Sequence, residues 1–238
     1  MGRKKYVVMM AAGSGTRMGA QLPKQFVEIG GKAILRRTME VFMEACPDIS
    51  VITVLPKQYI DYWKDYCYKN NFICPQVLVA GGITRFHSVR NALKKVPAGA
   101  LVAVHDGVRP LVSVQLVKEM FSQAENKSAL IPVVPCVDTM KVLQKTMAED
   151  GIEELVAMPG QTVDRTFLYG AQTPQIFHSE LLKEAYDQAF DTSFTDDASV
   201  VERQGKSLSY VPGERLNIKI TTSEDLILAE AVLNLKGV

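Results

Sequence analysis

The residues best suited to bind an anion lie near the start of the chain. A short apolar run is followed by Gly13, Gly15 and Gly19 and by two cations, Arg17 and Lys24. Glycines let a backbone turn tightly and bring N–H groups against phosphate oxygens where a Cβ would collide. The segment therefore predicts a cradle for a triphosphate, whose negative charge the two cations would offset. A plain strand-to-helix turn with surface cations is the alternative.

Two common phosphate-binding loops do not fit this segment. A dinucleotide-binding loop has the pattern G-x-G-x-x-G, with an acidic residue about 20 positions further on. Here Gly19 falls one residue too late, and the next strand-like run, 51–55, continues into Pro56 and Lys57. A P-loop needs Gly-Lys followed by Ser or Thr, which residues 19–21 do not provide. The segment instead resembles the A-A-G-x-G-x-R-M and P-K-Q start of the pyrimidine-nucleotide transferases that make CDP-activated alcohols.

A carboxylate and an arginine follow the apolar run 101–105, which includes His105. The C-terminal end of a buried parallel strand is where ligands of doubly wound sheets bind. Asp106 is suited to hold Mg²⁺ on a triphosphate, directly or through water, and Arg109 can hold phosphate oxygens with its planar fork. The alternative is a helix-capping Asp106 beside a surface arginine. We expect His105 to be a packed strand residue.

A double glycine opens a predicted helix at residue 85. Backbone groups at Gly81 and Gly82, which carry no side chains, can contact the edge of a small base, and the Ser88 hydroxyl can donate or accept a hydrogen bond. A simple turn is the alternative. His87 has no partner at metal-binding spacing, so we expect it on a solvated face.

The composition excludes several classes of protein. The 238 residues carry 27 basic and 26 acidic side chains and a net charge of +1, so no global field favours nucleic acid or an anionic membrane as a partner. The apolar run 6–12 is too short for an export signal or a membrane span. Cysteines 46, 67, 74 and 136 lack metal-site spacing, and we expect four buried thiols in a reducing compartment. These features predict a cytoplasmic protein.

Strand-like and helix-like segments alternate along most of the chain. The predicted strands are 6–12, 51–55, 77–80, 101–105 and 129–134. The predicted helices are 34–45, 58–68, 85–96, 114–126, 179–190 and 223–235. This order predicts an α/β protein with a mostly parallel, twisted sheet covered by helices on both faces. The length favours a single domain over residues 1–238.

The alternation breaks down between residues 136 and 170. Extended pieces at 138–143 and 162–165 flank a polar middle. Two such pieces joined by a loop predict a projecting β-arm. A thin arm cannot bury both of its faces alone, so we expect a second copy of the chain to cover it in a homodimer. A hairpin that folds back on its own domain is the alternative.

Four further segments complete the pattern, although each is weak by itself. They are T-V-D-R at 162–165, A-Q-T-P-Q at 171–175, T-D-D-A-S at 195–199 and N-I-K-I-T-T at 217–222. Taken in order with the segments above, they resemble the 2-C-methyl-D-erythritol 4-phosphate cytidylyltransferases of the non-mevalonate isoprenoid route. The resemblance implies a Rossmann-like three-layer nucleotidyltransferase fold. It also implies transfer of a cytidylyl group from CTP to methylerythritol phosphate.

The resemblance assigns roles to single residues of this chain. Catalysis falls to Arg17, Lys24, Asp106, Arg165 and Lys219, with Mg²⁺ as cofactor and Asp106 as its ligand. CTP is expected to contact Ala11, Ala12, Gly13, Gly15, Gly82 and Ser88. The acceptor phosphate would be held by Arg109, Thr139, Arg165, Thr195 and Lys219.

Departures from the family pattern are modest. Ile83 stands where an acidic residue is often found, which removes a side-chain contact to the nucleotide, and Gly107 and Tyr169 replace a common alanine and tryptophan. The ribitol 5-phosphate cytidylyltransferases are the alternative within the class, but they usually start A-G-G and lack T-V-D-R and T-D-D-A-S. Remote alternatives are an NAD-dependent dehydrogenase, which would lack its acidic ribose partner here, and a non-catalytic nucleotide sensor.

Overall fold

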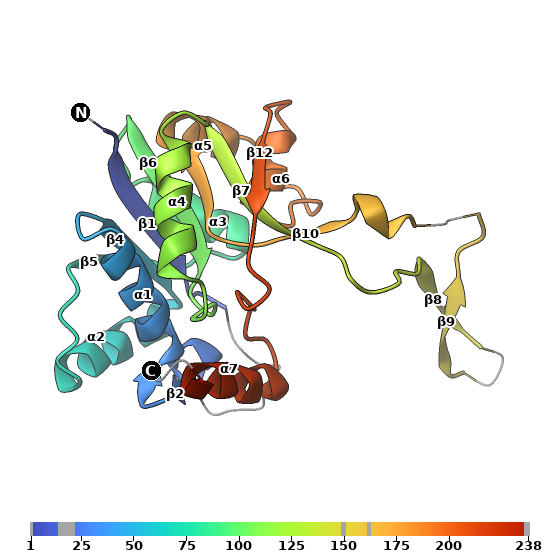
Figure 1. The fold of residues 1–238 in the computed structure, drawn as a ribbon, viewed down its shortest axis with the longest axis horizontal. Helices are drawn as coiled ribbons and strands as arrows, with labels where there is room; N and C mark the ends of the chain where they lie inside the picture. The colour runs from blue at the N-terminus through green and yellow to red at the C-terminus, as the bar shows by residue number, and fades with distance from the viewer. Residues whose placement is uncertain (1, 14–21, 149–150, 161–162, 236–238) are drawn as a thin grey trace.

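The computed structural model describes residues 2–13, 22–148, 151–160 and 163–235. Its main strands are β1 (Lys4–Met10), β4 (Ser50–Leu55), β5 (Gln76–Ala80), β6 (Ala100–Asp106), β7 (Ala129–Pro135), β10 (Tyr169–Ala171), β11 (Gln175–His178) and β12 (Ser209–Pro212). Within the described residues they form an eight-stranded sheet in the order β10-β7-β11-β6-β1-β4-β5, with β12 beside β7 (Figure 1). Strands β10 and β11 run antiparallel to their neighbours, and the others are parallel.

The parallel core follows from continuous apolar runs. Strand β6 is buried along its whole length between β1 and β11. A strand covered on both faces has no polar side to alternate with, which explains the unbroken run of apolar residues at 100–104. The five strands predicted from such runs are confirmed, with ends that differ by one or two residues.

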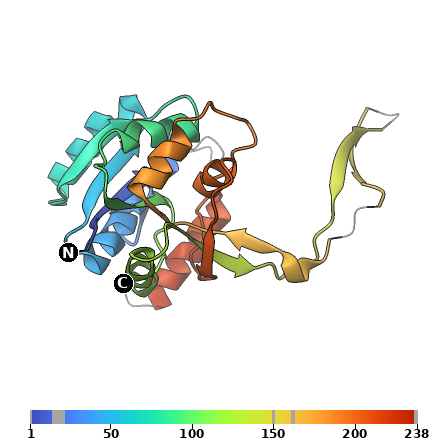
Figure 2. The same cartoon turned by 90° about the horizontal axis from the view of Figure 1, so that it is seen from above.

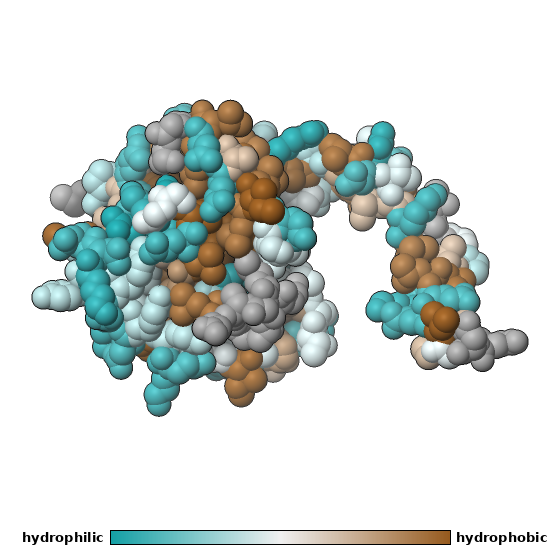
Figure 3. Space-filling view, turned by 90° about the horizontal axis from the view of Figure 1, so that it is seen from below, coloured by the Kyte–Doolittle hydropathy of each residue, from teal (hydrophilic) through white to brown (hydrophobic). Residues whose placement is uncertain are grey.

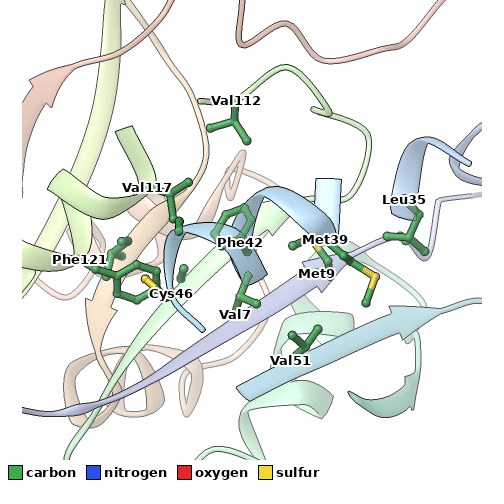
Figure 4. Packing of buried hydrophobic residues seen from close by; sticks show 14 of the residues in the cluster. Val7, Met9, Leu35, Met39, Phe42, Cys46, Val51, Val112, Val117 and Phe121 are labelled. Atoms are coloured by element: carbon green, nitrogen blue, oxygen red, sulfur yellow. The ribbon is translucent and has the colours of Figure 1, made fainter. Parts of the chain in front are cut away.

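Helices cover both faces of this sheet (Figures 1 and 2). They are α1 (Ile34–Ala45), α2 (Ile60–Lys69), α3 (Arg85–Leu93), α4 (Val114–Ala124), α5 (Ser179–Tyr186) and α6 (Asp197–Glu202). Helices α1, α2 and α4 pack in one cluster with Val7 and Met9, whereas α3, α5 and α6 pack in another with Val8. Figure 4 shows Val7 and Met9 near Phe42 of α1, and Phe121 of α4 beside Cys46. Successive residues of β1 therefore serve opposite layers, and the predicted three-layer α/β fold is confirmed.

Smaller elements lie around this core. Helix α7 (Ser223–Leu235) packs in a third apolar cluster with Ile29 of β2 (Glu28–Ile29) and with Val108. Strand β3 (Lys32–Ala33) pairs with β2. The 3-10 turns are η2 (Lys24–Phe26), η3 (Lys57–Tyr59) and η4 (Arg165–Phe167). Among the described helices, none has both the length and the apolar character needed to cross a membrane.

A β-arm projects from the body between β7 and β10, as predicted (Figures 1 and 2). Its hairpin consists of β8 (Leu143–Met147) and β9 (Glu153–Ala157), which pair antiparallel. Of the predicted extended pieces 138–143 and 162–165, only Leu143 is paired in this hairpin, and residue 162 lies outside the described residues. Arg165 begins the η4 turn instead of ending a strand.

Two other expectations need correction. The short strands β10, β11 and β12 were not predicted, because three or four residues between turns carry too little periodicity, whereas the Asp196-Asp197 pair indicated the start of helix α6. Of the four cysteines, Cys46 is buried, but Cys67, Cys74 and Cys136 are half-buried, so the expectation of four buried thiols is wrong. Burial still raises the pKa of the Cys67 and Cys74 thiols to about 11.

Candidate active site

A cavity of about 520 Å³ opens at the C-terminal ends of β1, β5 and β6. Its lining residues are Met10, Ala11, Ala12, Gly13, Lys24, Gln25, Gly82, Ile83, Thr84, Arg85, Ser88, Asp106, Val108, Lys219 and Thr221. Strand β1 pairs with β4 on one side and with β6 on the other, so the chain order reverses there. Such a switch point is the usual ligand site of an open α/β sheet.

A buried glutamine shapes the predicted phosphate cradle. Gln25 is 1% exposed and its Nε2 donates to the carbonyl oxygens of Ala11, at 2.8 Å, and of Gly13, at 3.1 Å. The amide thereby fixes the chain as it leaves β1, and η2 places Lys24 beside the same cavity. Gln25 was quoted in the P-K-Q pattern, yet sequence reasoning assigned it no role. Gly15 and Arg17 lie outside the described residues.

The double glycine makes a turn closed on itself. The Gly82 N–H donates to Ser88 Oγ at 2.9 Å, and Ser88 Oγ donates to the Thr84 carbonyl at 2.9 Å. A Cβ at Gly81 would lie 2.6 Å from Ala12 Cβ, so only glycine allows this turn to pack against the chain that follows β1. We had expected backbone groups of this turn to contact a base, but the Gly82 N–H is already bonded to Ser88 Oγ. Ser88 Oγ, whose hydrogen goes to Thr84, can only accept from a ligand.

Asp106 is the central charge of the cavity. Its Oδ2 accepts from Arg109 Nε at 3.1 Å and lies 3.3 Å from Lys219 Nζ. Burial favours the neutral carboxyl, but the charges of Arg85, Lys219 and Arg109 outweigh burial and hold the pKa of Asp106 below its usual range. Within the described chain, Asp106 ends β6 and caps no helix, so the helix-capping alternative is wrong.

His105, the neighbour of Asp106, is the packed residue that the sequence predicted. Its ring is fully buried, and burial lowers its pKa to about 3, so the imidazole is neutral. Thr173 Oγ1 lies 2.9 Å from His105 Nδ1 and accepts from the Asp106 N–H at 3.1 Å. Thr173 thus fixes the backbone from which the Asp106 carboxylate projects.

Buried amides hold the segment that carries Lys219. Asn217 is fully buried, and its Nδ2 donates to the Thr173 carbonyl at 2.8 Å. The Asn217 carbonyl accepts from Arg109 Nη1 at 2.7 Å. Arg109 therefore binds two protein groups, Asp106 and the Asn217 backbone, and does not line the cavity. Its predicted contact with the acceptor phosphate stays a prediction.

Three residues predicted for the acceptor lie elsewhere. Thr139 and Arg165 are exposed on the arm, where Arg165 Nη1 donates to the Val137 carbonyl at 2.8 Å. Thr195 is exposed and lines a second, more apolar cavity of about 810 Å³ with Phe167. Of the described residues predicted for the site, one subunit thus brings together in this cavity Ala11, Ala12, Gly13, Lys24, Gly82, Ser88, Asp106 and Lys219, but not these three. Arg85, Thr84 and Thr221 also line the cavity, although the sequence analysis gave them no role, and a cation three positions after Gly82 was the available signal for Arg85.

The cavity lies at the switch point of a parallel sheet and holds cations around one ionised carboxylate, an arrangement suited to an α/β protein that binds phosphorylated ligands. A family model described as 2-C-methyl-D-erythritol 4-phosphate cytidylyltransferase matches residues 6–235. The chain belongs to this family. It is 44% identical over 230 residues to the enzyme of that name from Bacteroides thetaiotaomicron. The match covers 97% of this chain and 100% of the relative.

Further relatives agree with this family. The protein of the same name from Phocaeicola vulgatus is 43% identical over 96% of this chain and 99% of its own. The crystal structure of 4-diphosphocytidyl-2C-methyl-D-erythritol synthase from Anaerococcus prevotii has a TM-score of 0.77 at 30% identity. That match covers 98% of this chain and 100% of the solved one.

Proposed function

We propose that the protein transfers the cytidylyl group of CTP to 2-C-methyl-D-erythritol 4-phosphate, giving CDP-methylerythritol and pyrophosphate for the non-mevalonate isoprenoid pathway. The observation that carries this proposal is the cavity in which Lys24 and Lys219 lie with Asp106 at the ends of parallel strands. Membership of the cytidylyltransferase family selects this reaction from the many that such a site can perform.

The reaction needs positioning and charge more than proton transfer. The acceptor phosphate is already ionised at neutral pH, so one of its oxygens can attack the α-phosphorus of CTP without a general base. A bond forms between that oxygen and the α-phosphorus, and the bond to the bridging oxygen breaks, releasing pyrophosphate. Lys24 would offset the charge that develops on the leaving group, and Lys219 would hold the attacking phosphate in line.

Magnesium fits the residues at this site. Among the described residues, no group of three His, Cys, Asp or Glu side chains forms a cage for a metal ion. Mg²⁺ commonly binds through one or two carboxylates together with substrate phosphates, and Asp106 supplies one ionised carboxylate. Asp106 would therefore hold the ion together with the phosphates of CTP. Bound Mg²⁺ would neutralise charge on the CTP phosphates.

The test of the proposed function is pyrophosphate release from CTP with methylerythritol phosphate, compared with ribitol and ribulose 5-phosphates. Selective use of methylerythritol phosphate supports the proposal, whereas a preference for ribitol phosphate would favour the alternative within the class. Release of pyrophosphate without any acceptor preference would contradict both. A cytoplasmic location is also proposed, and cell fractionation tests it.

The nucleotide preference is a first specific prediction. We expect CTP to be used far better than ATP or GTP, on the hypothesis that the base binds against the close turn at Gly81 and Gly82 and that this turn admits one pyrimidine ring. UTP should be intermediate at best, since Ser88 Oγ can accept from the amino group of cytosine but not from the carbonyl of uracil. Pyrophosphate release with the four nucleotides at equal concentration measures this. Equal turnover of a purine nucleotide would overturn the base assignment.

We also propose that the arm makes a homodimer whose sites are shared between subunits. Exposed apolar side chains gather on the arm, away from the body (Figure 3), and include Leu143, 44% exposed, Met147, 68%, and Leu155, 65%. Burial of such a surface against a second copy would stabilise the pair. Thr139 and Arg165 lie on the same arm, so a partner's arm would supply the acceptor groups that the cavity lacks.

Subunit mixing tests this sharing. Arg165→Ala alters the arm and Lys24→Ala alters the body, so both defects fall in one site of a mixed dimer and the other site is intact. We expect recovery of about a quarter of the wild-type sites after random exchange. A control mixture of Lys24→Ala with Lys219→Ala, two body variants, should recover nothing. Proven heterodimers of the first pair without recovery would favour an arm that serves its own subunit.

A further inference from the structure

The segment A-Q-T-P-Q at 171–175 has no part in the mechanism above, although it lies next to the site. It follows strand β10 at the base of the arm and leads into β11, which pairs with β6. Gln172 is 7% exposed and Thr173 is 5% exposed, and neither lines the cavity. The groups to which these two buried side chains bond indicate their role.

The Gln172 amide holds the backbone of Glu214 at two points. Its Nε2 donates to the Glu214 carbonyl at 2.8 Å, and its Oε1 accepts from the Glu214 N–H at 3.1 Å. Oε1 also accepts from Asn217 Nδ2 at 3.3 Å. A Cβ at Gly213 would lie 2.6 Å from this oxygen, so the glycine lets the chain approach the amide. The amide therefore serves the chain at 213–217 as a neighbouring strand would.

This chain carries Lys219 from the end of β12 to the start of α7. Residues 213–222 form no helix or strand, so no regular ladder of hydrogen bonds fixes their course. The Glu214 carboxylate accepts from the Ser113 N–H at 3.0 Å, and the Ile220 N–H donates to the Val108 carbonyl at 2.9 Å. With so few anchors, the position of Lys219 depends on the two-point contact with Gln172.

Thr173 joins the same chain to the other charge of the site. Its Oγ1 accepts from the Asp106 N–H at 3.1 Å, and its carbonyl accepts from Asn217 Nδ2 at 2.8 Å. The two charges meet between these anchors, with Lys219 Nζ 3.3 Å from Asp106 Oδ2. Groups of a functional site must be held within about 0.5 Å of their productive position by residues that are themselves locked in place.

We propose that Gln172 and Thr173 are positioning residues for the transfer reaction, and that together they set the separation of Lys219 and Asp106. This inference rests on the proposed function, in which Lys219 holds the attacking phosphate. The sheet itself does not need these side chains, since β7 pairs with β10, β11 and β12 through backbone ladders. Loss of Gln172 should therefore affect the acceptor, and loss of Thr173 the rate of the chemical step.

The first test is Gln172→Met, which keeps the length of the side chain and removes its amide. We expect the KM for methylerythritol phosphate to rise about threefold to tenfold, as for loss of neutral hydrogen bonds, with the KM for CTP within about twofold. Gln76→Met is the matched control, because the Gln76 amide accepts from Thr53 and Trp63 and does not line the cavity. Circular dichroism and thermal melting verify the fold of both variants.

A double variant and hydrogen exchange separate positioning from general support of the fold. If Gln172 acts through Lys219, adding Gln172→Met to Lys219→Ala should change the acceptor KM by less than about twofold. Backbone hydrogen exchange in Gln172→Met should become about threefold faster or more in residues 213–222 and stay unchanged in β1. Additive losses in the double variant, or equal rises in both KM values, would overturn the positioning role of Gln172.

Thr173→Val and Thr173→Ser test the other anchor. Valine removes the hydroxyl and leaves the Asp106 N–H without its acceptor, so we expect kcat to fall about tenfold to a hundredfold, as for a small displacement of a reacting group. Serine keeps the hydroxyl and should retain kcat within about threefold. Thr53→Val is the matched control, since Thr53 is also buried and its hydroxyl donates to Gln76. A folded Thr173→Val protein with unchanged kcat would overturn the role of Thr173.

The outcomes also distinguish this inference from the proposed function. If Gln172→Met or Thr173→Val does not fold, Gln172→Asn and Thr173→Ala decide, with the same expected directions and the same contradicting results. Absence of cytidylyl transfer by the unaltered protein would overturn the proposed function and the positioning role with it. Normal transfer by the unaltered protein, together with a folded Gln172 variant whose acceptor KM is unchanged, would overturn the positioning role alone.

Discussion

Replacement of Lys24 by alanine is expected to lower kcat by about 10²–10³ while the protein stays folded. The variant removes a cation from the charge that develops on the phosphates, and loss of one such stabilising group has effects of this size. The fold should survive because packing of the η2 turn depends on Gln25 and Phe26, which are 1% and 2% exposed. Steady-state kinetics of pyrophosphate release, with circular dichroism of the variant, provides the measurement. Arg17→Ala is expected to act in the same way.

The chain contains a matched control for the Lys24 variant. The tripeptide Pro-Lys-Gln occurs at 23–25 and again at 56–58, and in both places a 3-10 turn begins at the lysine. Lys57 is exposed and does not line the cavity, so Lys57→Ala should keep wild-type kinetics. A folded Lys24→Ala protein with kcat/KM close to that of Lys57→Ala would show that Lys24 has no part in catalysis.

Arg165→Ala and Lys219→Ala are expected to raise the KM for methylerythritol phosphate much more than the KM for CTP. Each variant removes a charged hydrogen bond to the acceptor phosphate, which corresponds to about tenfold to a hundredfold in affinity. The Arg165 effect should be the larger, because a planar fork can bind two phosphate oxygens and an ammonium is a point charge. Kinetics with each substrate varied in turn distinguishes the two constants.

A control on the arm accompanies the Arg165 variant. Lys145 is exposed on β8, where its Nζ lies 2.5 Å from Glu153 Oε1 in the same hairpin. Lys145→Ala should leave both KM values unchanged, so an effect confined to Arg165→Ala would not reflect general damage to the arm. A selective rise in the CTP constant for Arg165→Ala or Lys219→Ala would place that residue on the nucleotide side.

The sequence alone determined the layered core. Helix α1 was predicted with its observed bounds, Ile34–Ala45, because its apolar residues recur at helical spacing over three turns. The buried strands were found because long apolar runs between turns leave few alternatives. The place of the Gly81-Gly82 pair was also recognisable, since a loop that follows a strand directly stays at the end of that strand, and Gly82 lines the cavity there.

Tertiary structure decided which distant segments share a site. Lys219 lies beside Asp106, more than a hundred residues away in the sequence. Arg109, three residues after Asp106, donates to the Asn217 carbonyl and so holds the segment of Lys219 in place. The pairing of Arg85 with Asp197 joins two helix starts, and local sequence gives no sign of it. Propensity and periodicity describe neighbours along the chain, whereas a buried ion pair depends on how sheet order and helix packing bring remote side chains together. For this reason the sequence alone identified the family, while the tertiary structure brought Arg85 and the anchored Lys219 to one cavity.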